Sequence, residues 1–95
     1  MITLPRDDIK KQEILQKIAK KFAKNKEYSE QEVNEIISAF DVDDYVLFRR
    51  ELINFNYLGR DPSKGVYWFK KSALSKEDLE KIRKNQEKIL ELNED

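Results

Sequence analysis

In this 95-residue sequence, several basic side chains stand beside amide and aromatic side chains. Side chains of these types can bind the phosphates and bases of nucleic acids. Arg50 and Asn54 stand one helical turn apart in an apolar repeat, and both side chains can hydrogen-bond the edges of bases. Further on, cations flank the aromatic run YWF, a composition used by surfaces that follow a nucleic-acid backbone. The candidate nucleic-acid-binding residues are Arg50, Asn54, Arg60, Lys64, Lys70 and Lys71.

Arg49 belongs to the same apolar repeat but falls between Leu52 and Ile53 on a helical wheel, near the side that should be buried. A buried charge without a partner is costly, so we expect Arg49 to form a structural ion pair. The preceding predicted helix is rich in acidic residues, and Glu32 or Glu35 is the expected partner.

The composition argues against an enzyme. The sequence has no histidine and no cysteine, which removes the usual imidazole base, the thiolate nucleophile and the ordinary zinc site. It has no glycine-rich phosphate loop, and the run DVDD lacks the glycine that a calcium loop requires. We therefore expect no catalytic residue, no metal and no cofactor.

The length and the residue types also bound the setting of the protein. Ninety-five residues are enough for one domain with a modest core. The absence of cysteine gives no sign of an oxidising compartment, and no apolar run approaches the roughly 18 residues that a membrane span needs. With no secretory signal pattern at the N-terminus, we expect a soluble cytoplasmic protein that does not bind a membrane.

Two helices are predicted in the first half of the chain. The pair Asp7–Asp8 is typical of a first helical turn, and an apolar repeat then runs to Phe22. Ser29 and Glu32 have the spacing of a capping box, which predicts a second helix that runs to Phe40.

A third helix and a β-hairpin should follow. The helix begins at Asp43 or Asp44, buries Tyr45 with the apolar positions that follow, and ends near Asn56, which tolerates the left-handed conformation of a helix stop. The turn sequence DPSKG lies between two strand-like runs and predicts a hairpin over residues 58–70. Strand alternation divides VYWF into two faces, and we expect Trp68 to pack against the helices.

The order of these elements predicts the fold class. It is α+β, mostly helical and winged helix-turn-helix-like, with three helices and a β-hairpin wing in residues 1–73. Ser75 and Asp78 repeat the capping-box spacing, so residues 74–95 should form an added C-terminal helix. This helix either packs on the domain or forms a dimer seam. The candidate dimer residues are Leu79, Ile82, Gln86 and Ile89.

Three segments, YSEQEVNEII, DDYVLFRRELINFNYLGRD and GVYWF, carry a family resemblance. Together they make the sequence similar to the bacterial domain-of-unknown-function family 2087, whose members occur alone or appended to transcriptional regulators. The resemblance covers about residues 14–70 and implies a winged-helix-like domain associated with regulation, without an established activity. One departure is the pair Asn56 and Tyr57, which stands where a glycine-containing turn is expected at the end of the third helix.

Two functional hypotheses follow. The first is a small regulatory DNA-binding, transcription-regulator-like protein whose affinity is weak or depends on a partner, and Arg50 and the basic hairpin favour it. The second is a protein-interaction or oligomerisation module that keeps the winged-helix shape and makes no direct DNA contact. It is favoured by Leu47, expected to be exposed, and by residues 27–44, which carry seven acidic and no basic groups and would repel a polyanion. The partner is thus double-stranded DNA or another protein, and a homodimer fits either hypothesis.

Overall fold

The structure is a computed structural model that describes the backbone of residues 1–93 and the side chains of residues 1–86. Over this range the fold is α+β, with four helices and one three-stranded antiparallel sheet of strand order β1-β3-β2. The elements in chain order are α1 (Asp8–Ala19), β1 (Glu27–Ser29), α2 (Glu30–Ser38), α3 (Tyr45–Asn54), β2 (Leu58–Asp61), β3 (Val66–Phe69) and α4 (Lys76–Asn93).

The helices begin where their capping residues predicted. The Asp7 carboxylate accepts hydrogen bonds from the backbone at the start of α1, and the Asp44 carboxylate does the same for α3. The Ser29 hydroxyl accepts from the Glu32 amide (3.1 Å) while the Glu32 carboxylate accepts from the Ser29 amide (3.0 Å). The same reciprocal pair of hydrogen bonds joins Ser75 and Asp78 at the start of α4. Both predicted capping boxes are confirmed.

The end of α3 is a capping motif built on an asparagine. Asn56 has a φ of 63°, and its amide donates to the Ile53 carbonyl (3.0 Å). The next amide, that of Tyr57, donates to the Leu52 carbonyl (2.9 Å). These two bonds form a Schellman motif, in which asparagine replaces the more common glycine. The predicted end of the third helix is therefore confirmed.

The sheet contains one strand that was not predicted and one side chain on the unexpected face. β1 pairs with β3 so that Tyr28 lies opposite Tyr67, and both rings are buried. Trp68 points to the outer face and is 37% exposed, whereas Tyr67 is 2% exposed. The prediction that Trp68 packs against the helices is wrong, because the helices cover the face that carries Tyr67. The indole lies instead over Gly59, where an added Cβ would be 2.2 Å from a ring carbon.

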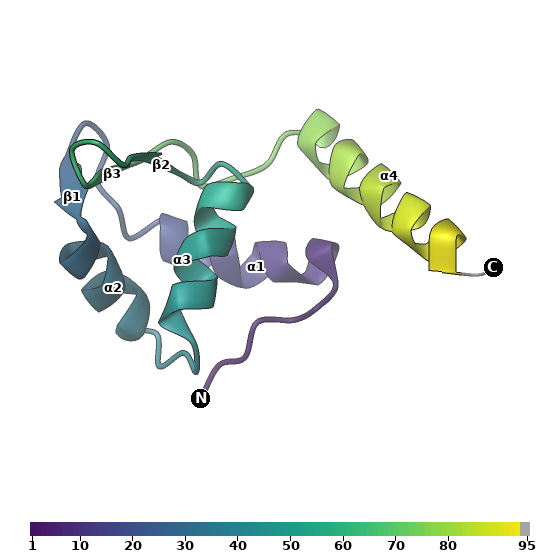
Figure 1. Cartoon of the computed structure of the whole chain (residues 1–95), viewed down its shortest axis with the longest axis horizontal. Helices are drawn as coiled ribbons and strands as arrows, with labels where there is room; N and C mark the ends of the chain where they lie inside the picture. Colours follow the sequence, from purple (N-terminus) through teal and green to yellow (C-terminus); the bar gives the residue numbers. More distant parts are fainter. Residues whose placement is uncertain (94–95) are drawn as a thin grey trace.

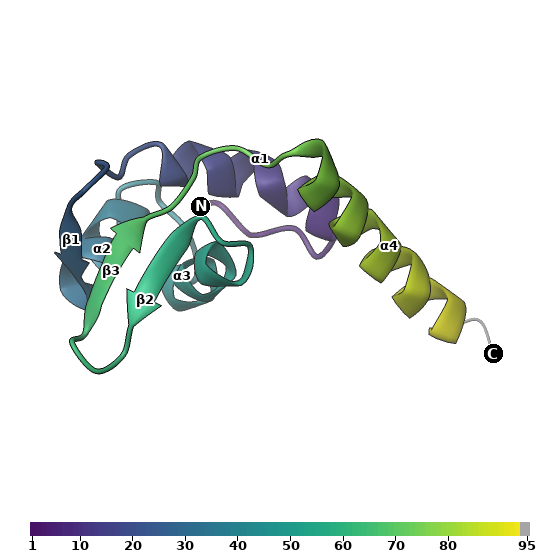
Figure 2. The same ribbon diagram turned by 90° about the horizontal axis from the view of Figure 1, so that it is seen from above.

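The core joins α1, α2, α3 and the sheet. Its largest fully buried side chains come from α1, α2, α3, the residue before β2 and the first residue of β2: Leu15, Ile18, Val33, Ile37, Phe48, Leu52, Tyr57 and Leu58. Figures 1 and 2 show α3 and the β2–β3 hairpin on the same side of the molecule, with α1 behind α3. The middle of α4 meets the N-terminal end of α1, where Gln86 bonds Asp7, and the helix extends away from the sheet (Figure 2). The arrangement leaves the side of α3 that carries Val46, Arg50 and Asn54 exposed.

Candidate nucleic-acid interface

The free side of α3 carries an exposed arginine. Phe48 and Leu52 point into the core, so Arg50 lies near the opposite pole of the helix, and its side chain is exposed. Arg50 has no ion-pair partner among the residues whose side chains are described. Its guanidinium is available to an anion in solution.

The hairpin, which lies on the same side of the molecule as α3 (Figures 1 and 2), adds two exposed cations. Arg60 lies opposite Tyr67 in the sheet, and its guanidinium carbon is 5.7 Å from the centre of that ring, a cation–π distance. At the tip, the Asp61 carboxylate accepts from the amides of Ser63 (3.0 Å) and Lys64 (3.4 Å). This Asx turn fixes the loop from which the exposed Lys64 projects.

Lys70 and Lys71 have different roles although they are neighbours. Lys70 is exposed, and its amine donates a hydrogen bond to the side-chain oxygen of Asn56 (3.3 Å). The Lys71 amine lies 3.0 Å from the Asp78 carboxylate, and the pair ties the end of β3 to α4. Because hydrogen bonds from Lys71 and then from Ser75 stabilise its charged form, the pKa of Asp78 lies below its ordinary range. Of the two lysines, only Lys70 joins the exposed cations. Arg50, Arg60, Lys64 and Lys70 are together called the basic surface.

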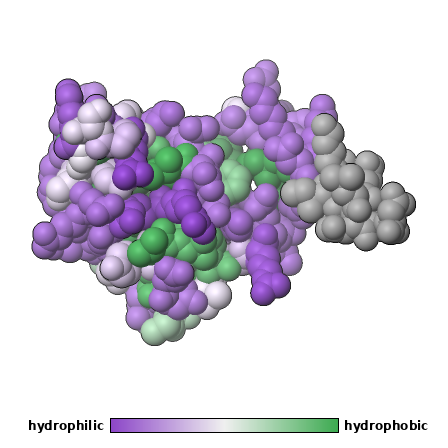
Figure 3. All heavy atoms as spheres, viewed as in Figure 1, coloured by the Kyte–Doolittle hydropathy of each residue, from purple (hydrophilic) through white to green (hydrophobic). Residues whose placement is uncertain are grey.

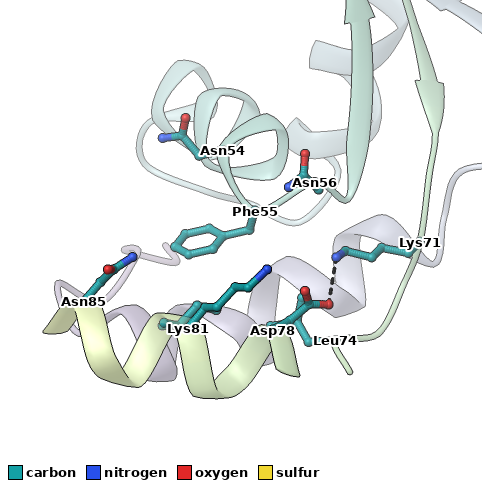
Figure 4. Close-up of a pocket in the computed structure, with 9 residues that line it drawn as sticks. Asn54, Phe55, Asn56, Lys71, Leu74, Asp78, Lys81 and Asn85 are labelled. Carbon is teal, nitrogen blue, oxygen red and sulfur yellow. Dashed lines mark hydrogen bonds and ion pairs between the residues drawn. The ribbon is translucent and has the colours of Figure 1, made fainter. Parts of the chain in front are cut away.

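Asn54 is exposed but lines a groove between the end of α3 and α4 (Figure 4). It stands one turn beyond Arg50, on the flank of α3 that faces α4. The structure thus places five of the six predicted nucleic-acid-binding residues at the surface, and four of these form the basic surface.

Arg49 forms an ion pair with a different carboxylate from the predicted ones. Its side chain is 18% exposed, donates to the Asn34 side-chain oxygen (2.5 Å) and lies 3.4 Å from a Glu30 carboxylate oxygen. Glu32 is held by its capping box, and Glu35 instead accepts a hydrogen bond from a glutamine of its own helix. The predicted partners are therefore wrong, because one predicted partner already has a structural role and the other lies away from α3.

The Glu30 carboxylate also connects this cluster to the sheet. The Tyr67 hydroxyl donates to the same Glu30 oxygen (3.2 Å), so the contacts of Arg49 link α3, α2 and β3. Burial, and then this hydrogen bond, raise the pKa of Tyr67. Asn34 and Glu30 were missed from the sequence, although they are four residues apart and share one face of α2.

The acidic residues before α3 have partners within the chain. Asp41 lies 3.6 Å from the N-terminal amine, Asp43 accepts from the Thr3 hydroxyl (2.8 Å), and Asp44 caps the helix. The N-terminal segment also pairs with this turn through an Ile2–Val42 bridge. These contacts reduce the repulsion toward a polyanion but leave the carboxylates near the surface.

An apolar patch beside these acids was not predicted. Tyr45 is 43% and Val46 47% exposed, whereas Leu47 packs partly against the core. Side chains tilt toward the N-terminus of a helix, so Tyr45, the first residue of α3, points past the end of the core. The predictions that Tyr45 is buried and Leu47 exposed are both wrong. Figure 3 shows hydrophobic side chains among hydrophilic ones on the face that carries α3.

The predicted dimer residues make contacts within the chain as far as they are described. Ile82 is buried, Leu79 is half-buried, and the Gln86 side-chain amide donates to the Asp7 carboxylate (3.2 Å). The Gln86 hydrogen bond attaches α4 to the start of α1. The side chain of Ile89 lies outside the described residues, and a homodimer stays a prediction.

The side chains described in residues 1–86 do not bring together three acidic groups that could hold a metal ion. In the part of the chain that the structure describes, no helix is both long and apolar enough to cross a membrane. The chemistry on the surface is that of exposed cations next to hydrogen-bonding amides.

The structure is thus that of a small α+β domain with exposed cations on its third helix and its hairpin. Residues 1–69 match the domain-of-unknown-function family 2087, described as uncharacterised proteins conserved in bacteria, and the chain belongs to that family. The match confirms the resemblance found in the sequence, and α4 lies beyond the matched residues. No curated protein and no solved structure matches the chain.

Proposed function

We propose that this chain is a winged-helix domain that binds double-stranded DNA weakly. Support comes from the order α1-β1-α2-α3-β2-β3 and the sheet order β1-β3-β2, which are those expected for a helix-turn-helix followed by a hairpin wing. In this arrangement α3 is the helix that enters the major groove, and the hairpin lies over the adjacent backbone.

The observation that carries the proposal is that Arg50 of α3 and Arg60 and Lys64 of the hairpin are exposed and have no ion-pair partner among the described residues. The two elements that carry them lie on the same side of the molecule (Figures 1 and 2). Arg50 stands midway along α3, where its planar guanidinium can hydrogen-bond a guanine edge. Arg60 and Lys64, together with Lys70, contact phosphates of the backbone.

Weak affinity follows from the charges around α3. Asp43 and Asp44 precede the end of the helix that would lie deepest in the groove, and each carboxylate there opposes binding. Replacing Asp43 by asparagine keeps an acceptor for Thr3 and leaves the helix cap intact, so duplex affinity is expected to rise without a loss of stability.

A salt titration of duplex binding tests the proposal. Three phosphate contacts predict that the logarithm of the binding constant falls with the logarithm of salt at a slope of about −2.7. Lys64→Ala should reduce that slope by about 0.9, and fluorescence anisotropy of a labelled duplex of about 20 base pairs measures both. The matched control is Lys20→Ala, an exposed lysine at the end of α1, which lies behind α3.

Two results would count against DNA binding. One is no binding to the duplex at about 50 mM salt, a low ionic strength at which the attraction between cations and phosphates is only weakly screened. The other is an equal loss of affinity in Lys20→Ala and Lys64→Ala, which would show that any surface lysine contributes equally and that the hairpin does not contact the duplex preferentially.

A second candidate function is a contact with a basic protein surface. The observation that favours it is the exposed pair Tyr45 and Val46 beside Asp41 and Asp43, an apolar patch with acidic neighbours. Such a patch suits a partner that presents cations around an apolar centre. Asp43→Asn separates the two functions, because it should strengthen binding to DNA and weaken binding to a basic partner.

A further inference from the structure

A groove with a volume of about 300 Å³ lies between the C-terminal end of α3 and α4 (Figure 4). Its apolar lining comes from three places in the chain: Phe55 follows α3, Leu74 precedes α4, and Ile82 lies on α4. The volume is at the lower end of the range found for small-molecule sites. The apolar lining would hold a single ring rather than a bare ion.

The polar lining consists of three side-chain amides, two amines and one carboxylate: Asn54, Asn56, Asn85, Lys71, Lys81 and Asp78. Asn54 lies on the α3 side, and Lys81 and Asn85 stand one turn apart on α4, so their side chains project from the same face of that helix. Figure 4 shows the Lys81 amine reaching into the space between α4 and the end of α3. The Asn54 side chain is directed away from α4 (Figure 4), so the donors available to an acidic group in the groove are Lys81 and Asn85 on α4.

The charged groups that line the groove sum to one net positive charge, that of Lys81. The only carboxylate that lines it, Asp78, is paired with Lys71 at 3.0 Å. Lys81 has no ion-pair partner among the described residues. The carbonyls at the end of α3 are also bonded, through the amides of Asn56 and Tyr57, so the negative end of that helix dipole is partly neutralised.

We propose that this groove binds a small organic acid with one ring, whose carboxylate contacts Lys81 and Asn85 while the ring packs on Phe55 and Ile82. An inorganic anion would leave the apolar lining uncovered, and a neutral ring would leave the lysine without a partner. The site does not depend on DNA binding, although it includes Asn54 of the helix proposed to enter the groove of DNA.

Three probes separate the two parts of the site in titrations of the full chain. Benzoate has both the ring and the carboxylate, benzyl alcohol has the ring alone, and acetate has the carboxylate alone. NMR signals of the Asn54 and Asn85 side-chain amides report binding at the groove itself. Benzoate is expected to shift these signals with saturation, at least about fivefold more tightly than either of the other probes, since each lacks one class of contact.

Charge removal gives the matched test. Lys81→Gln should weaken benzoate binding about tenfold, the usual size of one charge-assisted hydrogen bond, and should leave the weak binding of benzyl alcohol unchanged. Lys76→Gln removes the same charge from the first residue of α4, outside the groove, and should leave benzoate binding unchanged. Both lysines are exposed, so neither change should affect folding.

Three results would overturn the site. The first is acetate binding as tightly as benzoate, which would mean that only charge is recognised. The second is an equal effect of Lys76→Gln and Lys81→Gln on benzoate. The third is the absence of saturable shifts in Asn54 and Asn85 with benzoate up to about 50 mM, a range that covers the weak affinities of single-ring ligands.

Discussion

The hydroxyl of Tyr57 offers the sharpest test of how this small core is held together. Tyr57 is fully buried, and its hydroxyl donates to the side-chain oxygen of Gln12 (2.7 Å) while accepting from the side-chain amide of Gln16 (3.1 Å). Gln12 is 4% exposed, and its own amide donates to the Asp8 carbonyl (2.6 Å). Burial is the main reason that the pKa of Tyr57 is raised. Removing the hydroxyl would leave the Gln12 oxygen buried without a donor.

Tyr57→Phe is therefore expected to lower the free energy of unfolding by about 2 kcal/mol, the cost of leaving one buried polar atom unsatisfied. For a domain of this size, that loss corresponds to a fall in Tm of roughly 8–16 °C. Gln12→Met removes the acceptor instead and should cost a similar amount. The double variant removes both polar ends, so its cost should be smaller than the sum of the two by about 1–2 kcal/mol.

Urea unfolding followed by circular dichroism measures all three variants, and Tyr45→Phe is the control because that hydroxyl lies on a 43% exposed residue. The control should change the free energy of unfolding by less than about 0.5 kcal/mol. The reasoning is refuted if Tyr57→Phe costs no more than the control, or if the costs of Tyr57→Phe and Gln12→Met add within about 0.5 kcal/mol.

Three other perturbations follow from the contacts of single residues. Arg49→Met should cost about 2 kcal/mol in urea unfolding because it removes a charge-assisted hydrogen bond to α2, and an unchanged midpoint would contradict that role. Gly59→Ala should displace the Trp68 ring and shift its fluorescence emission, since the added Cβ would lie 2.2 Å from the indole; an unchanged spectrum would contradict the packing. The lowered pKa of Asp78 stabilises the fold above about pH 4, and this contribution is lost as pH falls through the folded-state value. Asp78→Asn should therefore reduce the acid sensitivity of unfolding, as should Lys71→Met, and a wild-type pH profile in either variant would count against the pair.

Local signals predicted the helices because each signal acts over one turn. The hydroxyl of Ser29 and the carboxylate of Glu32 bond each other's backbone amides, and these contacts need no other part of the chain. The stop at Asn56 is equally local, since a positive φ at one residue ends α3. The hairpin over residues 58–70 follows from turn residues at its centre. Propensity and hydrogen bonding within a few residues were enough for all of these.

The sheet required information from distant parts of the chain. β1 has only three residues, too few for an alternating pattern, and it exists because Tyr28 pairs with Tyr67 across the sheet. The same pairing decides which face of β3 is buried. Alternation separates Tyr67 from Trp68 but does not say which of the two side chains packs against the helices.

The partner of Arg49 could have been narrowed from the sequence. A glutamate that completes a capping box has its carboxylate held at the helix start, so the predicted box at Ser29 already made Glu32 a poor partner. The remaining candidates on α2 were Glu30 and Glu35, and only Glu30 shares a face with Asn34. The predicted capping box and the predicted Arg49–Glu32 ion pair thus use the same carboxylate, and comparing the two would have excluded Glu32 as the partner of Arg49.

The contacts of α4 limit how this helix could serve a dimer. Ile82 is buried, and Gln86 bonds the Asp7 carboxylate that caps α1, while Lys71 holds Asp78 at the other end of the same segment. A dimer seam that used Ile82 or Gln86 would first have to break these contacts within the chain, and the α1 cap would lose one hydrogen bond from Gln86. Self-association through α4 therefore competes with folding of the monomer unless it uses the part of the helix beyond residue 86.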